Sequence, residues 1–174
     1  MFFIESERLK MIPLTHDLLQ LLHINRPAME QALRLTPSNW RVDEFYQQEI
    51  DDAMVNFWLP KTLANPDNFI WYTDWEIVLK STNMAIGGMG FNGEPNEKGE
   101  AEVGYMIEEG HQNMGFATEA LTLMSGWALS QERVKSVVVH TYNHNLPSVR
   151  ILEKCGLELF NTADDGLLSF RIGK

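Results

Sequence analysis

The segment GHQNMGFATEAL, residues 110–121, joins a strand-like stretch, AEVGYMI, to an apolar helical pattern. The first amides of a helix have no partner within the helix and lie at the positive end of its dipole, where a phosphate can bind. Gly115 and Ala117 carry little or no side chain, so the main chain can approach a diphosphate closely there. Gln112 can close the loop or add a donor. The segment has neither a Walker ending nor the Rossmann glycine spacing, so it predicts a different kind of phosphate-binding turn.

Hydrophobic periodicity in the first part of the chain predicts the elements that precede this turn. An opening strand occupies residues 2–12, and a short helix covers residues 15–24. Apolar residues recur at spacings of three and four over residues 43–59, which predicts an amphipathic helix that Pro60 stops. The aromatic stripe of this helix is interpreted as core packing.

The pattern then changes to one of strands interrupted by turn residues, which places the phosphate-binding turn inside a sheet. The expected elements are strands 69–80, 84–91 and 101–107, helix 115–130, strand 134–142, helix 147–155 and closing strands 157–160 and 167–172. The first three strands are expected to be antiparallel neighbours. Because a helix separates strands 101–107 and 134–142, these two are expected to be parallel. The fold class is α+β, or mixed α/β, with a strand–helix–strand unit at its centre.

Composition limits the class of protein. A chain of 174 residues with 44% hydrophobic and 22% charged residues is typical of one soluble globular domain, here residues 1–174. The net charge of −10 disfavours nucleic acid as a partner and favours the approach of cations. No apolar run approaches the roughly 20 residues that span a bilayer, so no membrane association is expected. Cys155 is the lone cysteine, and the absence of a disulfide or a signal sequence predicts a cytoplasmic protein.

Three motifs carry a resemblance to a known family. HQNMGFATEAL resembles the acyl-CoA diphosphate loop, Q/R-x-x-G-x-G/A, of the GNAT superfamily of N-acetyltransferases. NHNLPSVRILEKCGLE, residues 143–158, resembles the second motif of that family, with Leu157 at its usual Phe. IESERLKMIPLT, residues 4–15, resembles the first strand of the branch that acetylates the N-termini of ribosomal proteins. The resemblance implies the GNAT fold, a mixed and mostly antiparallel sheet that is flanked by helices and splayed at the cofactor groove.

The resemblance also implies a chemistry, the direct transfer of acetyl from acetyl-CoA to an amine. The residues implied to hold the diphosphate are Gln112, Asn113, Met114, Gly115, Phe116, Ala117 and Thr118. The main chain of Tyr105, Met106 and Ile107 would pair with the pantetheine arm and polarise the thioester carbonyl. Asn145 would hydrogen-bond the pantetheine, although a role as a helix cap is equally consistent with its position before Pro147.

A primary amine, with a pKa near ~10, must lose a proton before it attacks. The resemblance makes Glu102 the first candidate base and His140 the second; each could instead be an ordinary polar residue of a strand. Many GNAT enzymes protonate the leaving thiolate with a Tyr, but Leu152 stands at that position. Ser148 is the alternative acid, and direct release of the thiolate is the other route.

The sequence therefore predicts an acetyl-CoA-dependent N-acetyltransferase that needs no metal. Its acceptor is an amine, either a cationic small molecule or a protein N-terminal α-amine. The alternative is a non-catalytic CoA-binding module that acts as a sensor or an interaction protein, and the missing Tyr at position 152 favours it. Acceptor specificity is expected to come from residues 24–65 and the closing strands. Dimers are common in the family, so the resemblance is compatible with a homodimer, but the sequence leaves the oligomeric state open.

Overall fold

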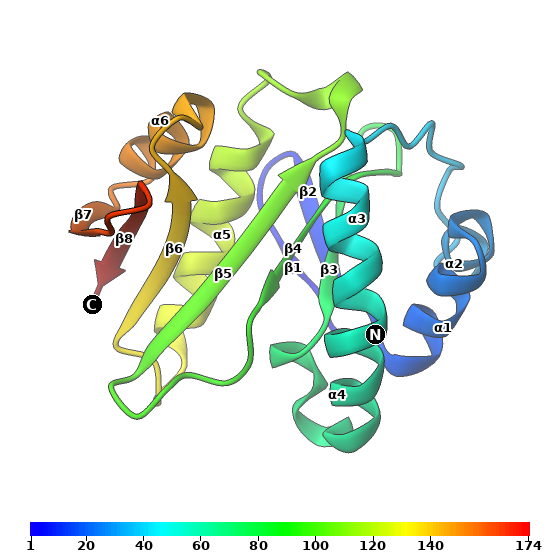
Figure 1. The fold of residues 1–174 in the computed structure, drawn as a ribbon. Coiled ribbons are helices and arrows are strands. Elements are labelled where there is room, and N and C mark those ends of the chain that lie inside the picture. The colour runs from blue at the N-terminus through cyan, green and yellow to red at the C-terminus, as the bar shows by residue number, and fades with distance from the viewer.

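The computed structural model describes all 174 residues and contains one sheet of 8 strands with helices on both faces (Figure 1). The strand order is β1-β2-β3-β4-β5-β6-β8-β7, and every neighbouring pair is antiparallel except β5 and β6. The strands are β1 (Ile4–Glu5), β2 (Leu9–Pro13), β3 (Asp74–Leu79), β4 (Met84–Phe91), β5 (Glu100–Ile107), β6 (Ser136–Tyr142), β7 (Glu158–Thr162) and β8 (Leu167–Gly173). The α-helices are α1 (His16–Ile24), α2 (Arg26–Ala32), α3 (Glu44–Ala53), α4 (Leu59–Ala64), α5 (Phe116–Ser130) and α6 (Leu146–Lys154). The predicted mixed, mostly antiparallel sheet is confirmed.

The N-terminal third differs most from the expectation. The opening strand is two strands, because the chain turns back between β1 and β2, and α2 was not predicted. Pro60 does not stop the helix that begins at Glu44. The chain continues through a π-helical segment, Met54–Trp58, into α4, where Pro60 lies in the first turn. Leu59 donates its amide to the carbonyl of Met54, five residues back, so the helical chain passes Pro60 through the wider π-helical turn.

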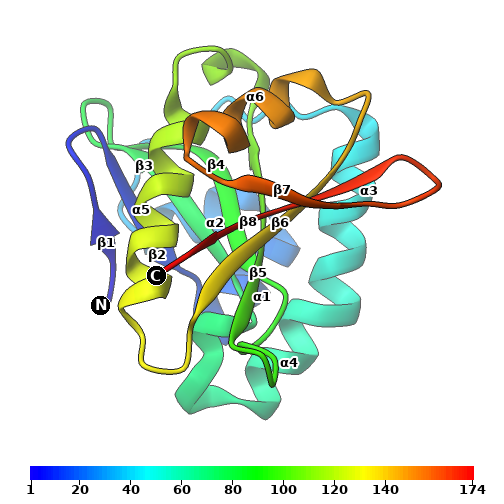
Figure 2. The same cartoon turned by 90° about the vertical axis from the view of Figure 1, so that its left-hand side faces the viewer.

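The sheet separates two groups of helices. In Figure 2, α5 lies on one face and α3 on the other. The face toward α5 is apolar, and its core includes Trp75, Ile77 and Leu121, all fully buried. The opposite face carries Asp74 and Glu76 on β3, beneath the helices that precede this strand. A smaller apolar cluster joins α1, α2 and the π-helical segment.

The feature of the sheet that matters most for function is the divergence of β5 and β6. The two strands pair only where Glu100–Glu102 meet Ser136–Val138, and they separate beyond that point (Figure 1). Each strand then follows its other neighbour, since β5 stays paired with β4 as far as Ile107 and β6 stays paired with β8 as far as Tyr142. The result is a V-shaped gap with free main-chain edges, open toward the start of α5.

Candidate active site

A cavity of about 880 Å³ lies against the sheet at this gap. Its walls come from α3 and the π-helical segment on one side and from β3–β6 and the start of α6 on the other. It brings together several residues that the sequence analysis selected. The predicted site residues on its lining are Glu102, Tyr105, Met106, His140, Asn145 and Ser148.

The turn that leads from β5 into α5 has free main-chain donors, as the sequence predicts. None of the N–H groups from Gln112 to Thr118 donates a hydrogen bond to another protein group. Gly115 caps α5 with a positive φ of 82°, a conformation that favours glycine. The Gln112 side chain donates to the main-chain carbonyl of Ile107 at 2.9 Å, so it closes the loop. This row of unpaired amides at the mouth of the gap suits an anion.

Arg8 and Glu119 hold this turn in place from the β1–β2 connection. Arg8 Nε is 2.6 Å from Glu119 Oε2, and Arg8 Nη1 donates to the carbonyl of Met114 at 3.2 Å. The hydroxyl of Ser6 also donates to Glu119 at 2.6 Å. Burial alone would raise the pKa of Glu119, but the hydrogen bonds from Ser6 and Arg8 lower it. Glu119 is therefore turned toward Arg8, which places a cation beside the unpaired amides.

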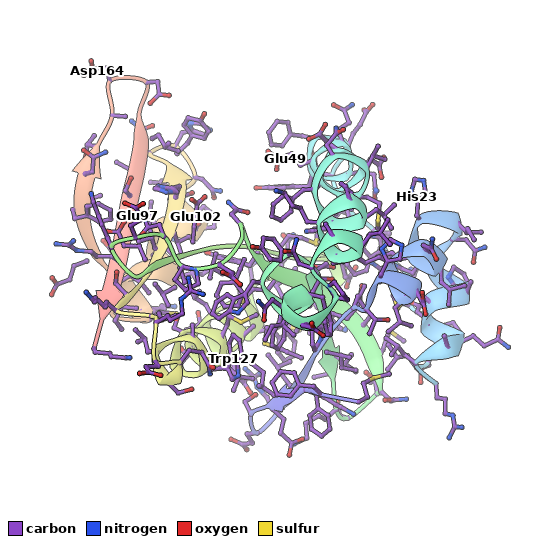
Figure 3. The ribbon with its side chains drawn as sticks, turned by 90° about the horizontal axis from the view of Figure 1, so that it is seen from below. His23, Glu49, Glu97, Glu102, Trp127 and Asp164 are labelled. Atoms are coloured by element: carbon purple, nitrogen blue, oxygen red, sulfur yellow. The ribbon has the colours of Figure 1, made fainter.

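Glu102 and His140, the two candidate bases, lie near each other across the gap. Glu102 Oε2 is 3.8 Å from His140 Nε2, and Glu102 Oε1 accepts a hydrogen bond from Asn92 at 2.5 Å. His140 Nδ1 is 2.9 Å from the hydroxyl of Ser169. Figure 3 shows Glu102 on β5, facing the space between β5 and α3, where Glu49 projects from α3. Each candidate base thus has a polar partner that fixes its orientation and leaves a side open to the cavity.

Ser148 has a partner that sequence reasoning missed. Its Oγ is 3.1 Å from the hydroxyl of Tyr105, whose side chain reaches from β5 to α6. Burial raises the pKa of Tyr105 to about 12, so the phenol stays protonated at neutral pH. Leu152, at the position of the usual Tyr, is fully buried in the core. The hydroxyls of Tyr105 on β5 and Ser148 on α6 therefore pair with each other on the cavity lining.

Asn145 caps α6, because its side chain accepts from the amide of Ser148 at 3.3 Å. It also lines the cavity, so the cap role does not remove it from the gap. Cys155 is half-buried beside the carbonyl of Thr118 on α5, and burial raises the pKa of its thiol. His111 hydrogen-bonds Glu108 just before the turn. Cys155 and His111 do not line the cavity.

The aromatic stripe of residues 46–58 was wrongly interpreted as core packing. No residue of α3 is buried, and core packing holds only at the end of the stripe, where Met54 is buried and Trp58 packs against the smaller apolar cluster. Tyr46, Ile50 and Phe57 line the cavity instead. The helical period was read correctly, but periodicity alone does not say whether an apolar face packs on a core or on a groove.

Asp74 and Arg8 were also missed. Asp74 lies in a largely apolar strand pattern, FIWYTDWEIVLK, where the alternation of Asp74 and Glu76 does not show that one carboxylate is paired and the other is not. Arg8 is distant in sequence from the turn that it contacts. No group of three or more His, Cys, Asp or Glu side chains is arranged to hold a metal ion, and no helix has the length and apolar character to cross a membrane.

Comparisons with known proteins agree with this geometry. A family model described as an acetyltransferase (GNAT) domain matches residues 8–158. The uncharacterized N-acetyltransferase YjdG of Bacillus subtilis (strain 168) is 36% identical over 88 residues, which cover 51% of this chain and 52% of that protein. The uncharacterized N-acetyltransferase p20 of Bacillus licheniformis is 29% identical over 84 residues, covering 48% and 47% of the two chains. The chain thus spans about half the length of the curated relatives it matches.

Solved structures of similar fold cover nearly the whole chain. One is the acetyltransferase from Salmonella typhimurium that modifies the N-terminal serine of 50S ribosomal subunit protein L7/L12, with a TM-score of 0.69, 14% identity and 99% of each chain covered. Another is a spermidine N-acetyltransferase SpeG chimera from Vibrio cholerae and hSSAT, with a TM-score of 0.62, 16% identity and 96% of each chain covered. At these identities the likeness concerns the fold alone. The match to the family model, together with the gap and the turn beside it, identifies the chain as a member of the GNAT acetyltransferase family.

Proposed function

We propose that this protein is an acetyl-CoA-dependent N-acetyltransferase that transfers acetyl directly to an amine. The observation that carries the proposal is the V-shaped gap between β5 and β6, which leads to the unpaired amides from Gln112 to Thr118. The gap offers free strand edges to an extended, amide-containing arm, and the amides offer donors to a diphosphate. A coenzyme thioester has both parts, joined in this order.

The main chain supplies most of the contacts in this proposal. The amides of the turn would bind the diphosphate, and Arg8 would add a charge-assisted contact next to them. The edge of β5 at Tyr105, Met106 and Ile107 would pair with the pantetheine arm, and Asn145 would contact it from α6. Main-chain donors along β5 would also stabilise the negative oxygen of the tetrahedral intermediate.

Glu102 and His140 would together take the proton that the acceptor ammonium must lose. Glu102 Oε2 and His140 Nε2 are 3.8 Å apart, so an ammonium group placed between them can pass its proton to either side chain. Asn92 and Ser169 orient the two side chains from behind. Both candidate bases remain accessible from the cavity, with side-chain exposures of 44% and 34%.

Ser148 and Tyr105 would assist the departure of the thiolate. A phenol with a pKa of about 12 does not readily give up its proton, so its contribution is a hydrogen bond rather than a full proton transfer. Ser148 Oγ, which is 3.1 Å from the Tyr105 hydroxyl, can relay that hydrogen bond to the leaving sulfur. The hydroxyl pair weakens the case for a non-catalytic module, which was based on the missing Tyr at position 152.

Release of free thiol from acetyl-CoA in the presence of a panel of amines tests this function. The panel should contain alkylamines, diamines, polyamines, aminoglycosides and peptides with free N-termini. We expect amine-dependent thiol release together with acetylated product in mass spectra. Tight CoA binding, measured by calorimetry, with no thiol release across the panel would instead favour the non-catalytic module.

A further inference from the structure

Asp74, at the start of β3, lies on the far side of the cavity from the candidate bases. In the sheet Asp74 faces Gly90 of β4, and Gly90 faces Gly104 of β5, so the three positions form one row across the strands. Neighbouring strands are about 4.8 Å apart, which puts Asp74 about 10 Å from β5. Asp74 is therefore too far from the gap to act on the same nitrogen as Glu102 and His140.

The carboxylate of Asp74 has no cationic partner within the protein. The residue is only 8% exposed, yet its side chain forms no ion pair and no hydrogen bond with another side chain. The nearest cation, Arg26, is bound to both oxygens of Glu76 at 3.0 Å and stacks on Trp40. Burial, and then the charge of Glu76, raise the pKa of Asp74 well above its ordinary value. The main-chain amides of Trp75 and Met89 donate to the Asp74 carboxyl group, but no cation neutralises it. A buried carboxylate without a countercharge is unfavourable unless a ligand provides one.

The space beside Asp74 is kept open by glycine. A Cβ at Gly88 would lie 2.7 Å from Asp74 Oδ1 and 2.9 Å from Oδ2. Gly88 and Gly90 both line the cavity, so the floor between Asp74 and β5 has no side chains on β4. An extended chain can lie on such a floor with one end at Asp74 and the other at the gap.

The rest of the lining is suited to a cation. Asp52 and Glu49 extend from α3 over the cavity, and Tyr46, Phe57 and Trp58 add aromatic faces that attract positive charge. Arg26 is the one Lys or Arg side chain on the lining, and Glu76 neutralises it. The lining therefore favours an acceptor with more positive charge than the single ammonium that reacts.

We propose that Asp74 binds a second ammonium group of the acceptor, which makes the acceptor a diamine or polyamine. This proposal rests on the proposed transferase function, since it assumes that the reacting nitrogen lies at the gap between β5 and β6. The second nitrogen would then lie about 10 Å from the acetylated one, two strand spacings away. An acceptor with a single charge would leave Asp74 unpaired.

Kinetics with paired substrates test the proposal. Hexamethylenediamine and n-hexylamine have chains of equal length and differ in the second ammonium, whereas ethylenediamine is too short to span the floor. We expect wild-type enzyme to prefer hexamethylenediamine over both. Asp74→Asn should raise KM for hexamethylenediamine by about 10-fold or more, because a buried charge pair is lost, and should leave kcat and the kinetics of n-hexylamine unchanged.

Asp51→Asn is the matched control, since Asp51 is an exposed carboxylate of α3 that is not on the cavity lining. It removes the same charge and should leave the preference for the diamine intact. Gly88→Ala is a second test, because its methyl group would displace the Asp74 carboxylate; it too should weaken the preference. An unchanged KM in Asp74→Asn, or an equal loss for both hexyl substrates, would overturn the proposal.

A binding measurement separates this proposal from the proposed function. Hexamethylenediamine is titrated into the CoA complex of wild-type protein and of Asp74→Asn, with calorimetric detection. We expect measurable binding to wild type and at least about 10-fold weaker binding to the variant. If wild type releases no thiol with any amine, the transferase function fails, while this titration still decides the role of Asp74. Equal binding to the two proteins overturns it.

Discussion

The two parts of the proposed site are built in different ways. The proposed coenzyme end consists of main-chain amides from one continuous segment, Gln112 to Thr118, together with the free edge of β5. The acceptor end is assembled from side chains on α3, β3 and β6, which are far apart in the sequence. Main-chain donors tolerate many side chains around them, so the coenzyme end can be conserved in chemistry while the acceptor end is free to differ. The coenzyme end is accordingly the part that the sequence reveals.

The strongest way to break this comparison is to block the turn. Gly115→Glu places a negative side chain at a residue with φ of 82° and directly beside the proposed diphosphate site. We expect CoA affinity to fall by at least about 100-fold, because one face of the anion site becomes repulsive and the turn is strained. Calorimetric titration with CoA measures the effect, and circular dichroism checks the fold.

Gly126→Glu is the control for this change. Gly126 is exposed on α5, and a Cβ there meets nothing within 4 Å. The control adds the same charge to the same helix and should bind CoA like wild type. Equal affinity of Gly115→Glu and wild type would refute the assignment of the turn.

The next largest effect is expected on turnover, from substitution of the candidate base Glu102. Glu102→Gln should lower turnover by about 100-fold at neutral pH, where most of the acceptor amine is protonated. The loss should shrink at high pH, because free amine no longer needs a base. Turnover measured across this pH range separates the two roles: an equal loss at every pH would mean that Glu102 only positions the substrate. His140→Asn in the same series shows whether the two residues act as a unit.

Arg8 sharpens the comparison. It is a side chain at the proposed coenzyme end, where the other contacts come from the main chain. Arg8→Gln should weaken CoA binding by about 3- to 10-fold, since a charge-assisted contact and the brace on Glu119 are both lost. The weakening should be greater at low salt than at high salt. Arg133→Gln, which breaks an exposed pair with Glu94 far from the turn, is the control and should not change affinity. A loss that is independent of salt would argue for a purely structural brace.

The smallest expected effect concerns stability at the acceptor end. Burial raises the pKa of both Asp74 and Glu76 in the folded protein, so their charged forms are disfavoured there. Their contribution is therefore most stabilising below their unfolded pKa values, and it is lost as the pH rises through the higher folded values. Asp74→Asn removes one of these charges, so we expect an equal or higher Tm at neutral pH. Thermal unfolding with and without the substitution, at pH values from acid to neutral, measures this difference, and a clear fall in Tm at neutral pH would contradict it.

Much of the fold could be predicted because its signals are local. The strand character of β4 and β5, the Gly115 turn and the apolar face of α5 each lie within a short window, and all occur as expected. The path after Pro60 was wrong because a proline inside a helical pattern can belong to the first turn of a following helix. The sequence around Pro60 is compatible with the end of one helix and with the first turn of the next, and tertiary packing decides between the two.

The candidate site was predicted in part for the same reason. The turn and the motif at Asn145 are short segments with fixed spacing, so their residues could be selected. The pairs between Tyr105 and Ser148 and between Arg8 and Glu119 join residues from separate elements. Such contacts depend on how the sheet and helices meet, and no spacing in one sequence records them. Asp74 is hidden for a further reason, since its neighbours are those of an ordinary buried strand.

The glycines of β4 limit where the amino-acid sequence of this protein can change during evolution. A Cβ at Gly87 or Gly90 would lie 2.4 or 2.6 Å from the main-chain oxygen of Met106 or Thr73, so the backbone resists replacement there. At Gly88 the nearest atom is Asp74 Oδ1, 2.7 Å away, so replacement would displace the Asp74 carboxylate. Substitution is therefore restricted on β4, beneath the proposed acceptor site, and tolerated above it, on the exposed helix α3. New acceptor preferences should therefore arise by substitution on α3, while the glycines of β4 stay unchanged.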